Sequence, residues 1–166
     1  KYLARLEDAY LVQPCLPFAK SATSQLRKKR CFIDNGYLKL FEVKTDYGML
    51  LENLVFCELV KKGLHPRYHQ RKKECDFILP DEAIQVTHEL TESSQERETD
   101  GLLEAHDAYG LSKTTIITHN QEEQITKDGQ TIHVIPAWKW CLRIAQQPRG
   151  MRADAASAPK EPTQHE

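Results

Sequence analysis

The chain has 166 residues, 40% of them hydrophobic, and a formal net charge of −1. This length and apolar content suit one folded domain with a small appendage. The near-neutral charge excludes a protein that binds nucleic acid through bulk positive charge alone. No apolar run is long enough to cross a membrane, so we expect no membrane partner.

Residues 1–34 begin the chain with a helical pattern and then turn to short, basic and apolar segments. Apolar residues recur at helical spacing over residues 1–12. Two prolines, a basic run and a short apolar segment follow, which indicates a strand, a turn and a strand. This order is typical of the second half of a winged helix, so we predict a winged-helix remnant over residues 1–42. A helical pattern at the first residue also predicts that the chain is a piece of a longer protein.

Residues 43–145 are predicted to form one α/β domain. Residues 46–62 are the clearest helix, because Asp46 is a good N-cap and Gly63 follows a basic end. The further predicted elements are strands 67–70, 74–79 and 83–89, helix 93–108, strand 113–118, a hairpin of 124–126 with 130–135, and helix 136–144. Their order predicts a mixed sheet with flanking helices. Residues 146–166 show no periodicity, and we predict a disordered tail.

The five cysteines are scattered and form no Cys-x-x-Cys pair. They are Cys15, Cys31, Cys57, Cys75 and Cys141. An odd number without the spacing of a zinc site favours reduced thiols and a cytoplasmic location.

Glu52 is the first residue that points to chemistry. Its neighbours at helical spacing are Met49, Val55, Phe56 and Leu59, so the carboxylate lies on the apolar stripe of helix 46–62. Burying an unpaired charge is costly. We therefore expect Glu52 to have a partner or a metal, close to the strands of the sheet.

Asp76 is the second such residue. Strand alternation predicts that Asp76 shares a face with Glu74 and Ile78. If residues 81 and 82 form a two-residue turn, Asp76 lies directly opposite Thr87, with Gln85 diagonal to it on the same face. Glu52, Asp76 and Gln85 then converge. Two carboxylates and an amide oxygen suit Mg²⁺. The alternative is a buried polar network that holds the helix to the sheet.

Several segments together resemble a known family. They are residues 48–59, 74–77, 84–86, 97–98 and 134–138, preceded by 2–12. They are similar to the C-terminal domain of predicted prokaryotic AAA+ family ATPases, a domain of unknown function with a PD-(D/E)XK nuclease-like fold, and to the winged helix before it. The resemblance covers residues 1–145. It implies a restriction-endonuclease-like mixed sheet, an ATPase domain in cis upstream, and ATP as the cofactor of the parent chain.

The resemblance also implies a degenerate active site. Glu52 and Asp76 match the acids of the family motif and would be the metal ligands. Gln85 stands where active members have an acid, and Thr87 stands where they have a lysine. Losing one such charged group costs orders of magnitude in rate. We therefore expect weak Mg²⁺ binding at most and little or no catalysis.

Two basic runs are the candidate nucleic-acid contacts: Arg27, Lys28, Lys29 and Arg30, and Arg71, Lys72 and Lys73. The expected function is that of an accessory, regulatory module of an AAA+ ATPase that binds nucleic acid or a partner. A live Mg²⁺-dependent nuclease is one alternative. The other is a protein-interaction module whose docking face is the acidic segment 89–107.

Overall fold

The computed structural model describes residues 2–18, 30–41 and 45–146. Its helices are α1 (Tyr2–Asp8), α3 (Asn35–Phe41), α4 (Tyr47–Lys61), α5 (Glu92–Tyr109) and α6 (Ala137–Gln146). Its strands are β1 (Gln13–Pro17), β2 (Arg30–Phe32), β3 (Arg67–Gln70), β4 (Glu74–Ile78), β5 (Glu82–Val86), β6 (Lys113–Thr118), β7 (Glu123–Lys127) and β8 (Gln130–Pro136). Within these ranges no helix is both long and apolar enough to cross a membrane.

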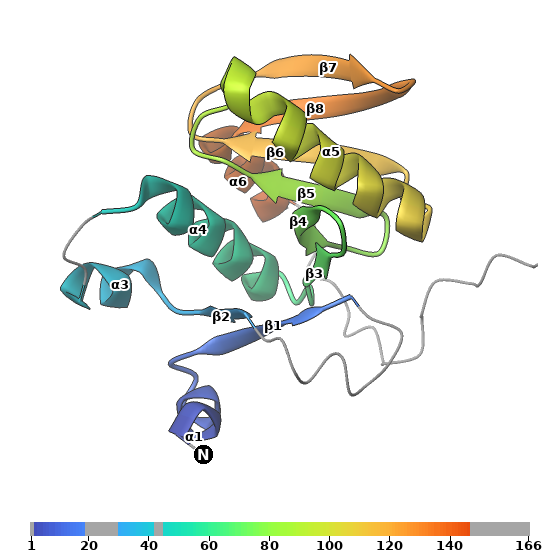
Figure 1. The fold of residues 1–166 in the computed structure, drawn as a ribbon. Coiled ribbons are helices and arrows are strands. Elements are labelled where there is room, and N and C mark those ends of the chain that lie inside the picture. Colours follow the sequence, from blue (N-terminus) through green and yellow to red (C-terminus); the bar gives the residue numbers. More distant parts are fainter. Residues whose placement is uncertain (1, 19–29, 42–44, 147–166) are drawn as a thin grey trace, which may run out of the picture.

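The strands form one mixed sheet in the order β2-β1-β3-β4-β5-β6-β8-β7 (Figure 1). Strands β5, β6 and β8 run parallel to one another, and β3, β4 and β5 are antiparallel neighbours. The predicted α/β class with a mixed sheet is confirmed. The strands predicted in segment 13–34 are present as β1 and β2, and β1 joins the sheet by pairing in parallel with β3.

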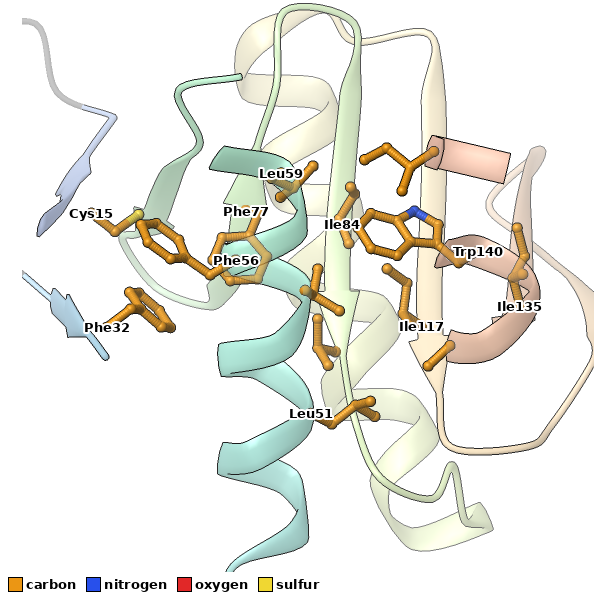
Figure 2. Close-up of a cluster of buried hydrophobic side chains, with 14 of the residues drawn as sticks. Cys15, Phe32, Leu51, Phe56, Leu59, Phe77, Ile84, Ile117, Ile135 and Trp140 are labelled. Atoms are coloured by element: carbon orange, nitrogen blue, oxygen red, sulfur yellow. The ribbon is translucent and has the colours of Figure 1, made fainter. Parts of the chain in front are cut away.

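Helices cover both faces of the sheet. On one face α4 and α6 pack against Phe77, Ile84 and Ile117 (Figure 2). On the other face Leu102 and its neighbours in α5 pack against a second apolar cluster of the sheet. The result is a three-layer arrangement in which the central strands are buried on both faces.

The helix predicted over residues 46–62 is confirmed as α4. The Asp46 side chain accepts a hydrogen bond from the backbone N–H of Met49 at 3.0 Å, and Lys62 caps the other end. Helix α3 was not predicted. Helix α6 ends at Gln146, and the rest of the predicted tail lies outside the described residues. The basic residues Arg27, Lys28 and Lys29 also lie outside them.

Gly101 marks a close approach of α5 to the sheet. A Cβ atom at this position would lie 2.0 Å from the backbone oxygen of Glu74 in β4. Because real atoms do not approach so closely, α5 can lie at this distance from β4 only while residue 101 has no side chain.

We predict that Gly101→Ala destabilises the protein. In an unconstrained helix this change stabilises by about 1 kcal/mol. Here the contact with the Glu74 carbonyl requires α5 to move, so we expect a loss of about 1–3 kcal/mol, the usual cost of overpacking. Urea unfolding measures it. Glu96→Ala on the exposed face of α5 is the control, and a stabilised Gly101→Ala variant would contradict the packing described here.

Candidate functional site

The predicted site residues meet in one cleft of about 1020 Å³. Helix α4, strand β2, the β3–β4 turn and the start of α5 all contribute to its lining. Glu52, Asp76, Gln85 and Thr87 line it. Basic residues of both predicted runs line it as well, namely Arg30, Arg71, Lys72 and Lys73.

Arg30 lies at the centre of the acidic residues. Its Nη1 atom is 3.3 Å from Glu52 Oε1 and 3.3 Å from Asp76 Oδ1. Its Nη2 atom pairs with Glu74. The guanidinium also stacks on the ring of Tyr68, 4.5 Å from the centroid. The residue predicted to contact nucleic acid therefore contacts three carboxylates of the chain itself.

Asn53 fixes the strand that carries Arg30. This buried residue of α4 accepts a hydrogen bond from the backbone N–H of Ile33 at 3.2 Å and donates to the carbonyl of the same residue. It also donates to Asn35 at 2.7 Å. Because both backbone groups of Ile33 are tied to α4, the three-residue strand β2 is held where Arg30 reaches Glu52.

A β-bulge turns Asp76 toward α4. The register of β3 and β4 shifts between the pairs Arg67–Ile78 and His69–Cys75. As a result Phe77 packs in the α4 cluster, while Cys75 and Ile78 pack in the α5 cluster. The predicted face shared by Asp76 and Ile78 is therefore wrong, because simple alternation fails at a bulge, which redirects a side chain.

The predicted register between β4 and β5 is also wrong. Phe77 pairs with Ile84, and the backbone N–H of Leu79 donates to the carbonyl of Glu82 at 2.8 Å. The two-residue turn is therefore Pro80–Asp81, as the preference of proline for the first turn position favours. Asp76 therefore lies beside Gln85 and Val86, with which it forms hydrogen bonds, and not opposite Thr87.

Side chains replace the backbone ladder where β4 and β5 separate. The backbone N–H of Val86 donates to Asp76 Oδ2 at 2.9 Å, and the backbone N–H of Asp76 donates to Gln85 Oε1 at 3.1 Å. Gln85 Nε2 in turn donates to Glu98 Oε2 at 2.6 Å. The Gln85 oxygen, which we expected to face a metal, is thus engaged by the Asp76 amide.

Glu98 is a buried residue of the cleft that the sequence analysis did not select. It is 5% exposed and accepts hydrogen bonds from Gln85 and Arg97. The signal was the one that identified Glu52, a carboxylate on an apolar stripe, because Leu102 and Ala105 follow at helical spacing. Thr87, by contrast, lies beyond the end of β5, and its hydroxyl donates to the carbonyl of Glu89 at 3.2 Å.

The turn that carries Arg71, Lys72 and Lys73 is held in place by α5. Glu104 accepts hydrogen bonds from the backbone N–H groups of Lys72 and Lys73, at 3.2 and 3.3 Å. The buried His69 contacts the same carboxylate oxygen at 2.8 Å. The three basic side chains are exposed, so a fixed backbone presents them to solvent at the cleft.

The arrangement does not fit the Mg²⁺ site that the family resemblance implies. The guanidinium of Arg30 lies between Glu52 and Asp76, where a shared ion would be bound. Among residues 2–18, 30–41 and 45–146, no three His, Cys, Asp or Glu side chains are placed to hold a metal ion. Arg30 provides the positive charge that these carboxylates need.

Burial and, to a smaller extent, the charge of Glu52 raise the pKa of Asp76 to about 7. The Val86 amide and Arg30 act in the opposite direction without outweighing burial. Burial also raises the pKa of Glu52, against the effect of Arg30. Asp76 is therefore protonated in the folded protein at pH values where the unfolded chain has already released this proton.

We predict that Asp76 makes the protein less stable as the pH rises. A carboxyl group whose pKa is higher in the folded state than in the unfolded state adds to the free energy of unfolding. This contribution is complete below the unfolded pKa and is lost as the pH rises through the folded pKa of about 7. Between about pH 5 and pH 8, wild type should lose unfolding free energy relative to Asp76→Asn. Urea unfolding across this range tests it, with the exposed Glu96→Gln as control. Parallel curves for wild type and Asp76→Asn would contradict the prediction.

Comparison with known proteins places the chain in a family. A family model described as "Domain of unknown function (DUF4143)" matches residues 47–140. An uncharacterized protein of Methanocaldococcus jannaschii is 34% identical over 155 residues, which cover 85% of this chain and 35% of the relative. An uncharacterized protein of Haemophilus influenzae is 34% identical over 152 residues, 86% of this chain and 36% of the relative. The chain thus spans about a third of the length of these relatives. No solved structure matches it significantly. Since the family model covers more than half of its length, the chain belongs to the DUF4143 family.

Proposed function

We propose that this chain is an accessory, regulatory module of an AAA+ ATPase, and that it binds nucleic acid in the cleft without cutting it. The observation that carries the proposal is the separation of charge within the cleft. The carboxylates Asp76 and Glu98 are buried and have partners, whereas Arg71 and Lys72 are exposed on a fixed turn. These exposed basic side chains are the ones available to a phosphate backbone that approaches the cleft.

Internal ion pairs remove much of the repulsion that the acidic residues would otherwise exert on phosphate. The cleft is lined by equal numbers of basic and acidic side chains, so its total charge does not attract an anion. Arg30 is paired with Glu52, Glu74 and Asp76, and Arg97 is paired with Glu98. Lys73 pairs with Asp100, so Arg71 and Lys72 of the exposed turn are the residues that most favour phosphate, through charge-assisted contacts.

The ATPase activity in this proposal belongs to another part of a longer protein, outside this chain. The two relatives are each almost three times as long as the region they share with this chain. In the proposal, the remaining length contains the ATP-binding domain, which acts on or is regulated by this module in cis. The family resemblance of residues 1–145 supports this arrangement.

Helix α5, which contains most of the acidic segment 89–107, is less suited to be a protein-docking face than its sequence indicates. Glu98 is bonded to Gln85, and Glu104 is bonded to His69 and the 71–73 turn. Asp100 pairs with Lys73 and Lys127. Three acids of α5 are thus engaged within the chain, which favours nucleic-acid binding over the interaction-module alternative.

We predict that nucleic-acid binding depends on the 71–73 turn and weakens steeply with salt. Arg71→Ala, Lys72→Ala and Lys73→Ala combined should lower affinity, and the slope of log K against log salt should fall by about 1 for each lost phosphate contact. Fluorescence anisotropy with a labelled oligonucleotide measures both. The matched control removes three lysines outside the cleft, Lys61, Lys113 and Lys139, and should bind as wild type does. Equal losses in the two variants, or a flat salt dependence, would count against the proposal.

We predict that the protein does not cleave DNA at a measurable rate with Mg²⁺ or Mn²⁺. Arg30 already occupies the space between Glu52 and Asp76, and Thr87 supplies no ammonium group near a nucleophile. Plasmid nicking by purified protein is the assay, with Asp76→Ala as control. Metal-dependent nicking that disappears in Asp76→Ala would establish the nuclease alternative. If wild type is inert, Thr87→Lys tests whether the missing charge alone abolished cleavage.

A further inference from the structure

Three aromatic rings from separate elements stack beside the cleft. Tyr47 is the first residue of α4, His88 follows β5, and His119 follows β6. The rings of His88 and His119 are stacked with centroids 4.9 Å apart and planes inclined by 14°. The ring of Tyr47 lies against His88 at 5.5 Å, inclined by 39°. The stack therefore has His88 at its centre and two outer rings.

The topology of the sheet brings these rings together. Strands β5 and β6 are parallel neighbours, so the residues that follow them emerge side by side. The backbone N–H of His119 donates to the carbonyl of His88 at 3.1 Å, which holds the two segments together. Figure 1 shows that β5 and β6 are adjacent in the sheet. The stack is thus anchored on two central strands.

The outer rings are exposed rather than part of the core. Tyr47 is 61% exposed, and His119 is also exposed. His88 lines the cleft together with Thr87, and Met49, 42% exposed, adds apolar surface at the start of α4. These exposed aromatic side chains lie at the border of the cleft that carries the basic 71–73 turn, and they are suited to receive a flat ligand.

Nucleobases are the flat groups that accompany phosphates. An aromatic ring stacks on any base, and each such contact is worth about 1–3 kcal/mol in single-strand binding. In a duplex the base faces are covered by neighbouring bases, whereas a single strand leaves them accessible. We propose that the cleft binds single-stranded nucleic acid in preference to duplex, with its phosphates on the 71–73 turn and its bases on Tyr47 and His119. This inference rests on the proposed function, because it assigns the form of nucleic acid to the same cleft.

The test compares a labelled single strand of about 16 nucleotides with the same sequence annealed to its complement, at one low salt concentration. Wild type should bind the single strand more tightly. Tyr47→Ala and His119→Ala should each weaken single-strand binding by about 5-fold to about 150-fold, the range that the loss of one stacked base predicts. Both should leave duplex binding nearly unchanged. Tyr47→Phe keeps the ring and should retain affinity, and Tyr2→Ala, an exposed tyrosine of α1 outside the cleft, should have no effect.

Two other results would contradict the preference for single strands. Equal or tighter binding of duplex overturns the single-strand inference, as does a Tyr47→Phe variant as weak as Tyr47→Ala. If binding then still depends on the 71–73 turn, the proposed function survives without the strand preference. If neither form of nucleic acid binds at low salt, both the inference and the proposed function fail. Circular dichroism of each variant shows whether it is folded, since Tyr47 and His119 are exposed and their loss should not unfold the chain.

Discussion

The ion pairs of Arg30 hold the cleft together. Glu52, Glu74 and Asp76 come from α4 and β4, and without a cation between them their charges would repel one another in a partly buried space. Arg30 lies on a strand of three residues, which Asn53 ties to α4. Strand β2, helix α4 and strand β4 therefore depend on one another. A change at Arg30, Asn53 or Asp76 is expected to disturb the packing of all three elements.

Local sequence signals predicted most of the helices and strands, and they also identified Glu52 as a buried acid of α4. The caps of α4, the Gly110 that ends α5 and the Asp128–Gly129 turn are short-range features, and they delimit the elements to within a few residues. Glu52 was identifiable because a helical stripe is readable from residues a few positions apart. Glu98 carries the same signal on α5, so it was equally accessible to this reasoning.

The remaining features depend on contacts between residues far apart in the chain. The bulge at Asp76 exists only because β3 and β4 pair with a shifted register, and the parallel pairing of β1 with β3 joins segments separated by α3 and α4. Arg30 ended a basic run, and nothing in its neighbours pointed to Glu52 or Asp76. Hydrophobic alternation also could not locate the turn between β4 and β5. A shift of the strand register by two residues leaves every side chain on the same face, so the two registers have the same pattern.

Gln85 illustrates why the site is better understood as a polar network than as a damaged active site. Its amide must accept a hydrogen bond from the backbone N–H of Asp76 and donate one to Glu98. An ionised glutamate can only accept, so an acid at this position would place two carboxylates 2.6 Å apart in a buried space. The amide at 85 and the carboxylate at 98 are therefore a matched pair. Placing an acid at 85 without also neutralising Glu98 would add repulsion instead of a metal ligand, so Gln85 and Glu98 have to be explained together.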